Sequence, residues 1–302
     1  MTVLAAPPHP VPKSNDDLAA HPTIFAPGLL AGRTIFVSGA GSGIGRATAW
    51  LAARLGARVV IGGRKADKLA AVVDSINARE GLQADYVVVD IRERDAVDAA
   101  FVEIGERFGG IDMLVNSAGG QFPQAAIDYS EKGWQTVINT NLNGTWHMMQ
   151  AAALAWREAG RGGSIVNVVV VNQGLYGVAH TSAARAGVIA FAEKAAVEWA
   201  PYGIRVNCVA PGAIETEGWA VYSEQARSRY PRTNPMMRAG SPWEIAEACV
   251  FLAGPGGSFI NGETLVVDGG GQHWGEVWTT GKPEYYAAAT RVWDDGGTTP
   301  GG

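Results

Sequence analysis

The sequence is poor in cysteine, has no dense basic stretch and has no long apolar run, and each absence excludes a class of protein. Its only cysteines, Cys208 and Cys249, lie in apolar segments without metal-ligand spacing, so we expect no metal site, buried reduced thiols and a cytoplasmic protein. The formal net charge of −5 at pH 7 argues against a nucleic-acid partner. Without an apolar run that could span a bilayer, we expect no membrane partner.

Residues 1–30 hold six of the fifteen prolines and show no basic region followed by an apolar core. We therefore expect no signal peptide and interpret these residues as an N-terminal arm that is either extended over the surface or disordered. Of the 302 residues, 47% are hydrophobic, which is enough for a full core. The length fits one large α/β domain or two ordinary ones.

Between residues 31 and 270, short apolar segments alternate with helical patterns. The predicted strands are residues 33–39, 57–63, 84–90, 111–119, 163–171, 203–212 and 262–270. Their nearly continuous apolar character is typical of parallel strands that are buried on both faces. The alternation predicts an α/β fold, a single doubly wound parallel-sheet Rossmann domain, with a substrate lid at about 213–240 and a C-terminal tail at 271–302.

The glycine-rich stretch "SGAGSGIG" joins the first predicted strand to the first predicted helix. Its glycines allow a tight turn and the close approach of a pyrophosphate, and the helix N-terminus adds free N–H groups for the phosphates. The spacing is G-x-x-x-G-x-G, and its place between strand and helix favours a dinucleotide site over a plain turn. The residues that we expect at the cofactor are Gly39, Gly41, Ser42, Ile44 and Gly45.

The second predicted strand ends in "IGGRK", where this type of fold contacts the adenosine ribose. An acidic residue there favours NAD, whereas arginine suits the 2′-phosphate of NADP. This chain has Arg64 and Lys65 and no acid, so we predict NADPH (NADP) as the cofactor. The alternative is a solvated basic turn before a helix.

Further motifs follow in order along the chain: "YVVVD" ending at Asp90, "NSAG" at 116–119, "NTNLNG" around Asn141, and "PG" at 211–212. Together with the glycine loop, they resemble the short-chain dehydrogenase/reductase family over about residues 30 to 270. The resemblance implies a nicotinamide-dependent oxidoreductase, commonly a homotetramer. It also implies further cofactor contacts at Asp90, Ile91, Asn116, Ala118, Gly119, Pro211, Gly212, Ile214 and Thr216.

The catalytic positions depart from the family pattern. Most members carry a serine at the end of the fifth strand and then Tyr-x-x-x-Lys on the next helix. Here Val170 stands at the serine position, Thr181 at the tyrosine position and Arg185 at the lysine position, and only Asn141 is unchanged.

One branch of the family has this pattern. The stretches "APGLLAG", "GGQF", "KGW", "TNLNGT", "GGSIVN" and "AARAGV" resemble peroxisomal trans-2-enoyl-CoA reductase, whose branch includes the 2,4-dienoyl-CoA reductases. The resemblance implies NADPH-dependent reduction of a carbon–carbon double bond conjugated to a thioester. A dienoyl reductase would carry a tyrosine at position 170, so Val170 argues for a simple enoyl substrate.

The residue types at these positions suit enoyl chemistry. Arg185 stays protonated, so it cannot act as an acid, but it can hold the nicotinamide ribose and stabilise an enolate. The proton can come from water ordered by Thr181 and Asn141. Alternatively, Thr181 or Ser182 merely caps the helix that holds Arg185.

Two other groups and two other functions stay open. His180 is a capping-loop residue or a proton shuttle, and the direction of the Tyr176 hydroxyl is open. With either as proton donor, the protein would be an NADP-dependent alcohol or carbonyl dehydrogenase. With no donor, it would be a cofactor-binding protein without turnover.

The predicted lid is rich in aromatic and methionine side chains, which suit either an acyl chain or a subunit interface. They are Trp219, Tyr222, Tyr230, Met236 and Met237. Four lid arginines could form a basic rim for CoA phosphates or be solvated charge: Arg227, Arg229, Arg232 and Arg238. The tail, with Trp274, Trp278 and Trp293, is expected to support an interface or the lid.

Overall fold

The computed structural model describes residues 11–170, 177–229 and 232–274. Within them, seven parallel strands form one sheet in the order β3-β2-β1-β4-β5-β6-β7. The strands are β1 (Thr34–Ser38), β2 (Arg58–Gly63), β3 (Gln83–Val88), β4 (Met113–Asn116), β5 (Gly163–Val168), β6 (Ile204–Pro211) and β7 (Thr264–Val267). Because the order reverses between β1 and β4, the sheet is doubly wound, and the predicted fold is confirmed.

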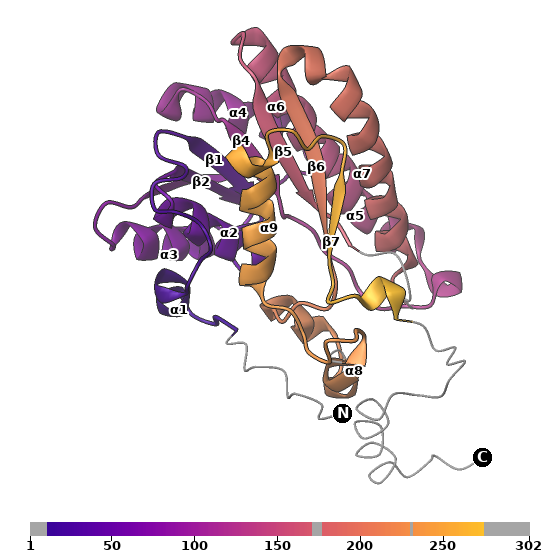
Figure 1. Ribbon diagram of the computed structural model, residues 1–302. Helices are drawn as coiled ribbons and strands as arrows, with labels where there is room; N and C mark the ends of the chain where they lie inside the picture. The colour runs from indigo at the N-terminus through magenta and orange to yellow at the C-terminus, as the bar shows by residue number, and fades with distance from the viewer. Residues whose placement is uncertain (1–10, 171–176, 230–231, 275–302) are drawn as a thin grey trace, which may run out of the picture.

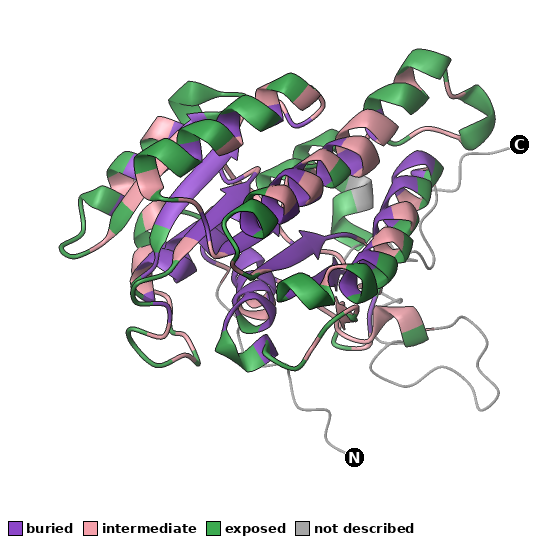
Figure 2. Cartoon of the chain, turned by 90° about the horizontal axis from the view of Figure 1, so that it is seen from above, coloured by how far each residue is buried: buried purple, intermediate pink, exposed green. Residues whose placement is uncertain are grey.

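Helices cover both faces of the sheet (Figure 1). The helices on one face are α2 (Gly43–Arg54), α3 (Ala66–Asn77) and α9 (Pro242–Ala253). Those on the other face are α4 (Arg94–Phe108), α6 (Gly144–Glu158) and α7 (Ala179–Glu198). Figure 2 shows the buried sheet between helices whose outer surfaces are exposed. In the described part of the chain, every helix falls short of the length or the apolar character that a membrane span requires.

Each face of the sheet has its own apolar core. Ile35 and Val37 of β1 belong to the core under α2 and α9, whereas Phe36 belongs to the core under α4, α6 and α7. This division follows from strand geometry, because successive side chains point to opposite faces. Cys249 and Cys208 are buried in the first and second core, as predicted.

A π-helical turn interrupts the long helical stretch between β4 and β5. The first part, α5 (Glu131–Ile138), begins after Ser130, whose hydroxyl accepts a backbone N–H of the first turn. The turn itself, Asn139–Asn143, leads into α6. Such turns are frequent at functional sites. This one carries Asn141, which is buried.

The described part of the predicted N-terminal arm is a folded segment that packs on α2 and α3. It contains a short helix, α1 (Asn15–Ala20), whose first turn is closed by a capping box of Ser14 and Asp17. Leu18 is buried in the core on the α2 side, and the Trp50 indole N–H donates to Asn15 Oδ1 (3.1 Å). The prediction of an extended or disordered arm is therefore wrong for this stretch, because a capped helix buries an apolar side chain there.

The helix that holds Arg185 starts earlier than the sequence suggests. α7 begins at Ala179, with Val178 at the N-cap position. The prediction that Thr181 or Ser182 caps this helix is therefore wrong, because both residues lie within its first turn. The Thr181 side chain is used elsewhere, as described below.

We expect Leu18→Ala to lower the free energy of unfolding by about 2–3 kcal/mol, since it removes a buried leucine side chain from the packing of α1. Urea denaturation measures the change. Ile24→Ala is the matched control, because the Ile24 side chain in the same segment is exposed, and it should change the stability by less than about 0.5 kcal/mol. Equal effects of the two substitutions would contradict the packing of α1.

Candidate active site

The candidate site lies where the strand order reverses, at the carboxyl ends of β1 and β4. Two glycines allow close backbone contacts of the glycine loop there. Gly39 has φ +71°, and a Cβ on it would lie 2.6 Å from Cα of Ala118 in the loop after β4. A Cβ on Gly45 would lie 2.6 Å from the carbonyl oxygen of Gly39. A side chain at position 39 would push the glycine loop away from the loop after β4, whereas one at position 45 would push the start of α2 away from the Gly39 backbone.

The glycine loop presents the N-terminus of α2 to the crevice. Gly41 and Ser42 form the turn, and α2 begins at Gly43 and continues through Ile44. The Ser42 side chain makes no capping hydrogen bond, so it leaves the N–H groups of the first turn to other acceptors. This arrangement fits the diphosphate of a dinucleotide.

The residues predicted at the adenosine end lie beside one another. Arg64 and Lys65 are exposed directly after β2, and the positive charge of Arg64 contributes to lowering the pKa of Asp90. The larger cause is Arg92, whose Nε donates to Asp90 Oδ1 at 2.9 Å. This ion pair is not among the contacts predicted from the sequence. Ile91 is buried, and its side chain occupies the space that a Cβ on Gly144 of α6 would need.

Arg185 lies buried at the centre of the site, with only 6% of its surface exposed. Its Nη2 donates to the carbonyl oxygen of Ala118 (3.2 Å), and its Nη1 donates to the carbonyl oxygen of Asn141 (3.4 Å) and to Thr145 Oγ1 (3.5 Å). No carboxylate among the described residues pairs with this guanidinium. Burial lowers the pKa of Arg185 to about 10, so the group stays charged at neutral pH.

The Asn141 side chain holds the loop after β4 in place. Its Oδ1 accepts from the N–H of Gly120 (3.0 Å), and its Nδ2 donates to the Gly120 carbonyl oxygen (2.9 Å) and to Thr181 Oγ1 (2.7 Å). Both amide hydrogens are therefore used within the protein. Asn141 positions the loop and orients Thr181, and the Thr181 hydroxyl hydrogen meets no acceptor among the described residues, so it can donate to a ligand or water.

His180 is fully buried in an aromatic cluster that the sequence analysis missed. Its ring stacks on Tyr129 (centroids 4.5 Å apart, 7° between planes) and meets the edge of Phe122 at 4.6 Å. Burial lowers the pKa of His180, which favours the neutral imidazole. Tyr176, the other possible proton donor, lies outside the described residues. Val170, at the position that is serine in most family members, follows β5.

The segment after β6 brings the remaining predicted residues to the crevice. Gly212 follows Pro211, and a Cβ on it would lie 2.8 Å from Cα of Asp268. Ile214 is buried and bridges to Gly240, which closes the segment into a loop. Thr216 is the N-cap of a short 3-10 helix, η4 (Glu217–Val221), and its Oγ1 accepts from the N–H of Gly218. It lies close to the glycine loop, because a Cβ on Gly43 would lie 3.5 Å from Cβ of Thr216.

A cavity of about 250 Å³ is lined by Met236 and Arg238 together with the end of β7, and neither Thr181 nor Arg185 lines it. Arg238 is held by two hydrogen bonds to Glu244 (3.1 and 2.7 Å), which argues against the alternative that its charge is merely solvated. Tyr222 contacts Gln121. Of the other residues named for the lid and tail, Tyr230, Trp278 and Trp293 lie outside the described residues.

Comparisons with known proteins identify relatives that cover most of the chain. The family model described as Enoyl-(Acyl carrier protein) reductase matches residues 39–272. The 3-oxoacyl-(acyl-carrier-protein) reductase FabG of Chlamydia trachomatis is 35% identical over 80% of this chain and 98% of its own length. The peroxisomal 2,4-dienoyl-CoA reductase of Danio rerio is 34% identical over 82% of this chain and 84% of its own length. Among solved structures, the citronellol catabolism dehydrogenase AtuB of Pseudomonas aeruginosa PAO1 has a TM-score of 0.73 and 42% identity, covering 83% of this chain and 99% of its own.

We expect Gly119→Ala to leave the fold intact but to lower reductase kcat/KM by about 10²-fold, because the new Cβ would lie 2.2 Å from Arg185 Nη2 and displace the guanidinium. Gly120→Ala is the control, since a Cβ there meets nothing within 4 Å. Steady-state kinetics and thermal unfolding of both variants test this. A fully active Gly119→Ala enzyme would show that the position of Arg185 does not matter.

Proposed function

The chain belongs to the short-chain dehydrogenase/reductase family, and we propose that this oxidoreductase uses NADPH to reduce the carbon–carbon double bond of a trans-2-enoyl thioester. The substrate would be acyl-CoA-like, in fatty-acid-type metabolism. The observation that carries the proposal is the buried Arg185 charge, which has no carboxylate partner among the described residues and lies next to Thr181 and Asn141.

The residues at the crevice fit a nicotinamide dinucleotide. Gly39 and Gly45 leave space that a Cβ would fill, and the N–H groups of the first turn of α2 can donate hydrogen bonds to a diphosphate. Arg64 and Lys65 would hold a 2′-phosphate, and Asp90 would lie at the adenine. When bound, the cofactor supplies a hydride to the substrate. The remaining proposed contacts are Gly41, Ser42, Ile44, Ile91, Asn116, Ala118, Gly119, Pro211, Gly212, Ile214 and Thr216.

Reduction of a conjugated double bond develops negative charge on the thioester oxygen. Arg185 supports such chemistry, because a buried cation without a carboxylate partner stabilises nearby negative charge more strongly than a solvated one does. Three of its five N–H donors contact protein oxygens, and the others can donate to the cofactor ribose or to the substrate.

Thr181 is the hydroxyl placed to deliver or relay the proton. It occupies the position that is tyrosine in most family members, and its oxygen accepts from Asn141 Nδ2. A threonine hydroxyl is a far weaker acid than a phenol, so it relays a proton from water better than it donates its own. The proton that adds to the substrate Cα can therefore arrive through a water held by Thr181.

A carbonyl reductase is the second candidate, since FabG of Chlamydia trachomatis is by its name a 3-oxoacyl reductase. That chemistry needs an acid on the substrate oxygen. The His180 ring is stacked on Tyr129 and meets the edge of Phe122, and burial lowers its pKa, which favours the neutral imidazole and weakens it as an acid. A cofactor-binding protein without turnover is the third candidate.

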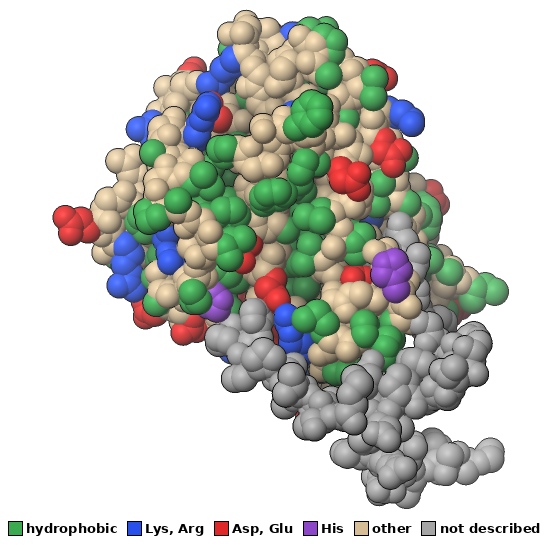
Figure 3. Space-filling view, in the orientation of Figure 1, with side chains coloured by type: hydrophobic (Ala, Val, Ile, Leu, Met, Phe, Trp, Pro, Cys, Tyr) green, Lys and Arg blue, Asp and Glu red, His purple; other side chains and the backbone are tan. Residues whose placement is uncertain are grey.

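We further propose a cytoplasmic homotetramer. Figure 3 shows hydrophobic side chains gathered over the face where α9 and β7 lie. β7 is one of the two edge strands of the described sheet, none of its residues is fully buried, and Phe251 of α9 is 39% exposed. An edge strand with a partly covered apolar face is the kind of surface that a second copy covers.

The proposal predicts NADPH oxidation with crotonyl-CoA and longer trans-2-enoyl-CoAs, and none with a ketone panel under the same conditions. Absorbance of the reduced nicotinamide measures the rate. Activity on ketones alone would favour the carbonyl reductase, and His180 would then be the residue to replace. Cofactor binding without any turnover would favour the third candidate.

We expect Arg64→Ala to weaken NADPH binding about tenfold and to leave NADH binding unchanged, because it removes a charge-assisted contact to the 2′-phosphate. Fluorescence titration with both cofactors measures this. The control is Arg58→Ala, which removes an exposed arginine at the opposite end of β2 and should change neither affinity. An equal loss for NADPH and NADH would contradict 2′-phosphate recognition by Arg64.

A further inference from the structure

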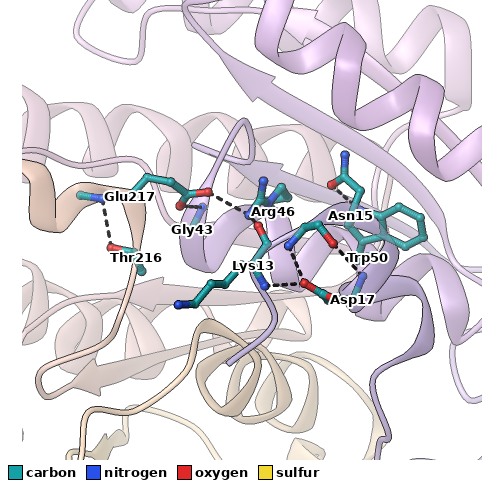
Figure 4. A network of polar contacts seen from close by, with 10 residues as sticks. Lys13, Asn15, Asp17, Gly43, Arg46, Trp50, Thr216 and Glu217 are labelled. Carbon is teal, nitrogen blue, oxygen red and sulfur yellow. Dashed lines mark hydrogen bonds and ion pairs between the residues drawn. The ribbon is translucent and has the colours of Figure 1, made fainter. Parts of the chain in front are cut away.

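An acidic side chain of the lid occupies the N-terminus of α2. Glu217 Oε2 accepts from the N–H of Gly43 at 3.0 Å, and its Oε1 lies 2.8 Å from Nη2 of Arg46 (Figure 4). Gly43 is the first residue of α2, and Glu217 is the first residue of η4, 174 positions later in the chain. The lid and the glycine loop are therefore joined directly by a carboxylate.

Three features favour a carboxylate at this position. The N-terminus of a twelve-residue helix carries a partial positive charge. Gly43 is the first residue of α2, so its N–H has no acceptor within the helix and is open to another one. Arg46 adds a full positive charge, and its Nη2 also donates to the carbonyl oxygen of Lys13 at 3.1 Å, so the N-terminal segment holds it in place.

The same N–H group belongs to the set that receives a diphosphate in this family of folds. A carboxylate and a diphosphate cannot both accept the Gly43 hydrogen at full strength, and their negative charges repel at this distance. The Glu217 side chain is about half exposed, so it can swing away into solvent without a large packing loss. The contact is therefore one that an incoming diphosphate can displace.

We propose that Glu217 is an internal competitor for the cofactor diphosphate, and that it sets the affinity of the protein for dinucleotides. When the diphosphate binds, the start of η4 leaves α2, and Arg46 is released from Glu217 to face the new anion. The start of the lid thus responds to cofactor binding. The inference rests on the nicotinamide cofactor of the family and not on which acyl substrate is reduced.

The test compares Glu217→Gln and Glu217→Ala with the matched control Glu215→Gln. Glu215 lies two residues earlier, pairs with the exposed Lys13 at 3.1 Å, and makes no side-chain contact with α2 among those found in the described residues. Each substitution removes one negative charge from the same segment. Fluorescence titration with NADPH and with NADH reports binding directly, without any acyl substrate.

We expect both Glu217 variants to bind NADPH and NADH about 3- to 10-fold more tightly than the unmodified protein, and by the same factor for both cofactors, since both carry the diphosphate. Glu215→Gln should stay within about twofold, because its charge is farther from the site and screened by water. Weaker binding by the Glu217 variants would overturn the proposal and make Glu217 a clamp on the bound cofactor. Unchanged binding would overturn it as well.

The same titrations separate this inference from the proposed enzyme function. Tight NADPH binding by the unmodified protein, with Glu217 variants that behave like it, would overturn only the competition. If the unmodified protein bound neither NADPH nor NADH, the cofactor assignment would fail and the competition with it. Circular dichroism of each variant checks the fold, and the exposure of Glu217 predicts unchanged spectra.

Discussion

The hydrogen bonds of the Arg185 guanidinium join α7 to three other parts of the protein: the loop after β4, the π-helical turn and α6. A buried charge without a carboxylate partner is expensive unless neutral dipoles compensate for it. Here two carbonyl oxygens and one hydroxyl do so, and each must be placed by its own element. Gly119 follows from the same constraint, because the guanidinium fills the space next to its Cα.

The π-helical turn supplies one of the oxygens that compensate for the Arg185 charge. It places the Asn141 carbonyl oxygen against Arg185 while the Asn141 side chain binds Gly120 and Thr181. One residue thus fixes the loop after β4, the hydroxyl at the tyrosine position and the cation. The crevice then contains two positively charged features of different character. Arg185 has only neutral protein partners among the described residues, whereas the N-terminus of α2 is already bound to Glu217.

The features that could be predicted from the sequence are those that a local pattern of residues decides. The seven strands, the glycine loop and the buried cysteines follow from apolar runs and glycine spacing, which are properties of short stretches. The start of α7 was misplaced, because Thr181 and Ser182 look like caps when their neighbours are unknown. The N-terminal arm was predicted to be extended or disordered because of its many prolines. A capped helix in it nevertheless buries one side chain, Leu18, against the domain.

By itself, the sequence determined the doubly wound sheet, the dinucleotide-binding loop and the replacement of the usual catalytic residues by Thr181 and Arg185. Only the tertiary structure decided that Arg185 has no carboxylate partner among the described residues, that Asn141 positions Thr181, and that Glu217 reaches Gly43. The reason is physical: strand and turn formation depend on residues close together in the chain, as the period of apolar side chains shows. The partner of a charge depends on which distant segments the fold brings within a few ångströms, and no local pattern contains that information.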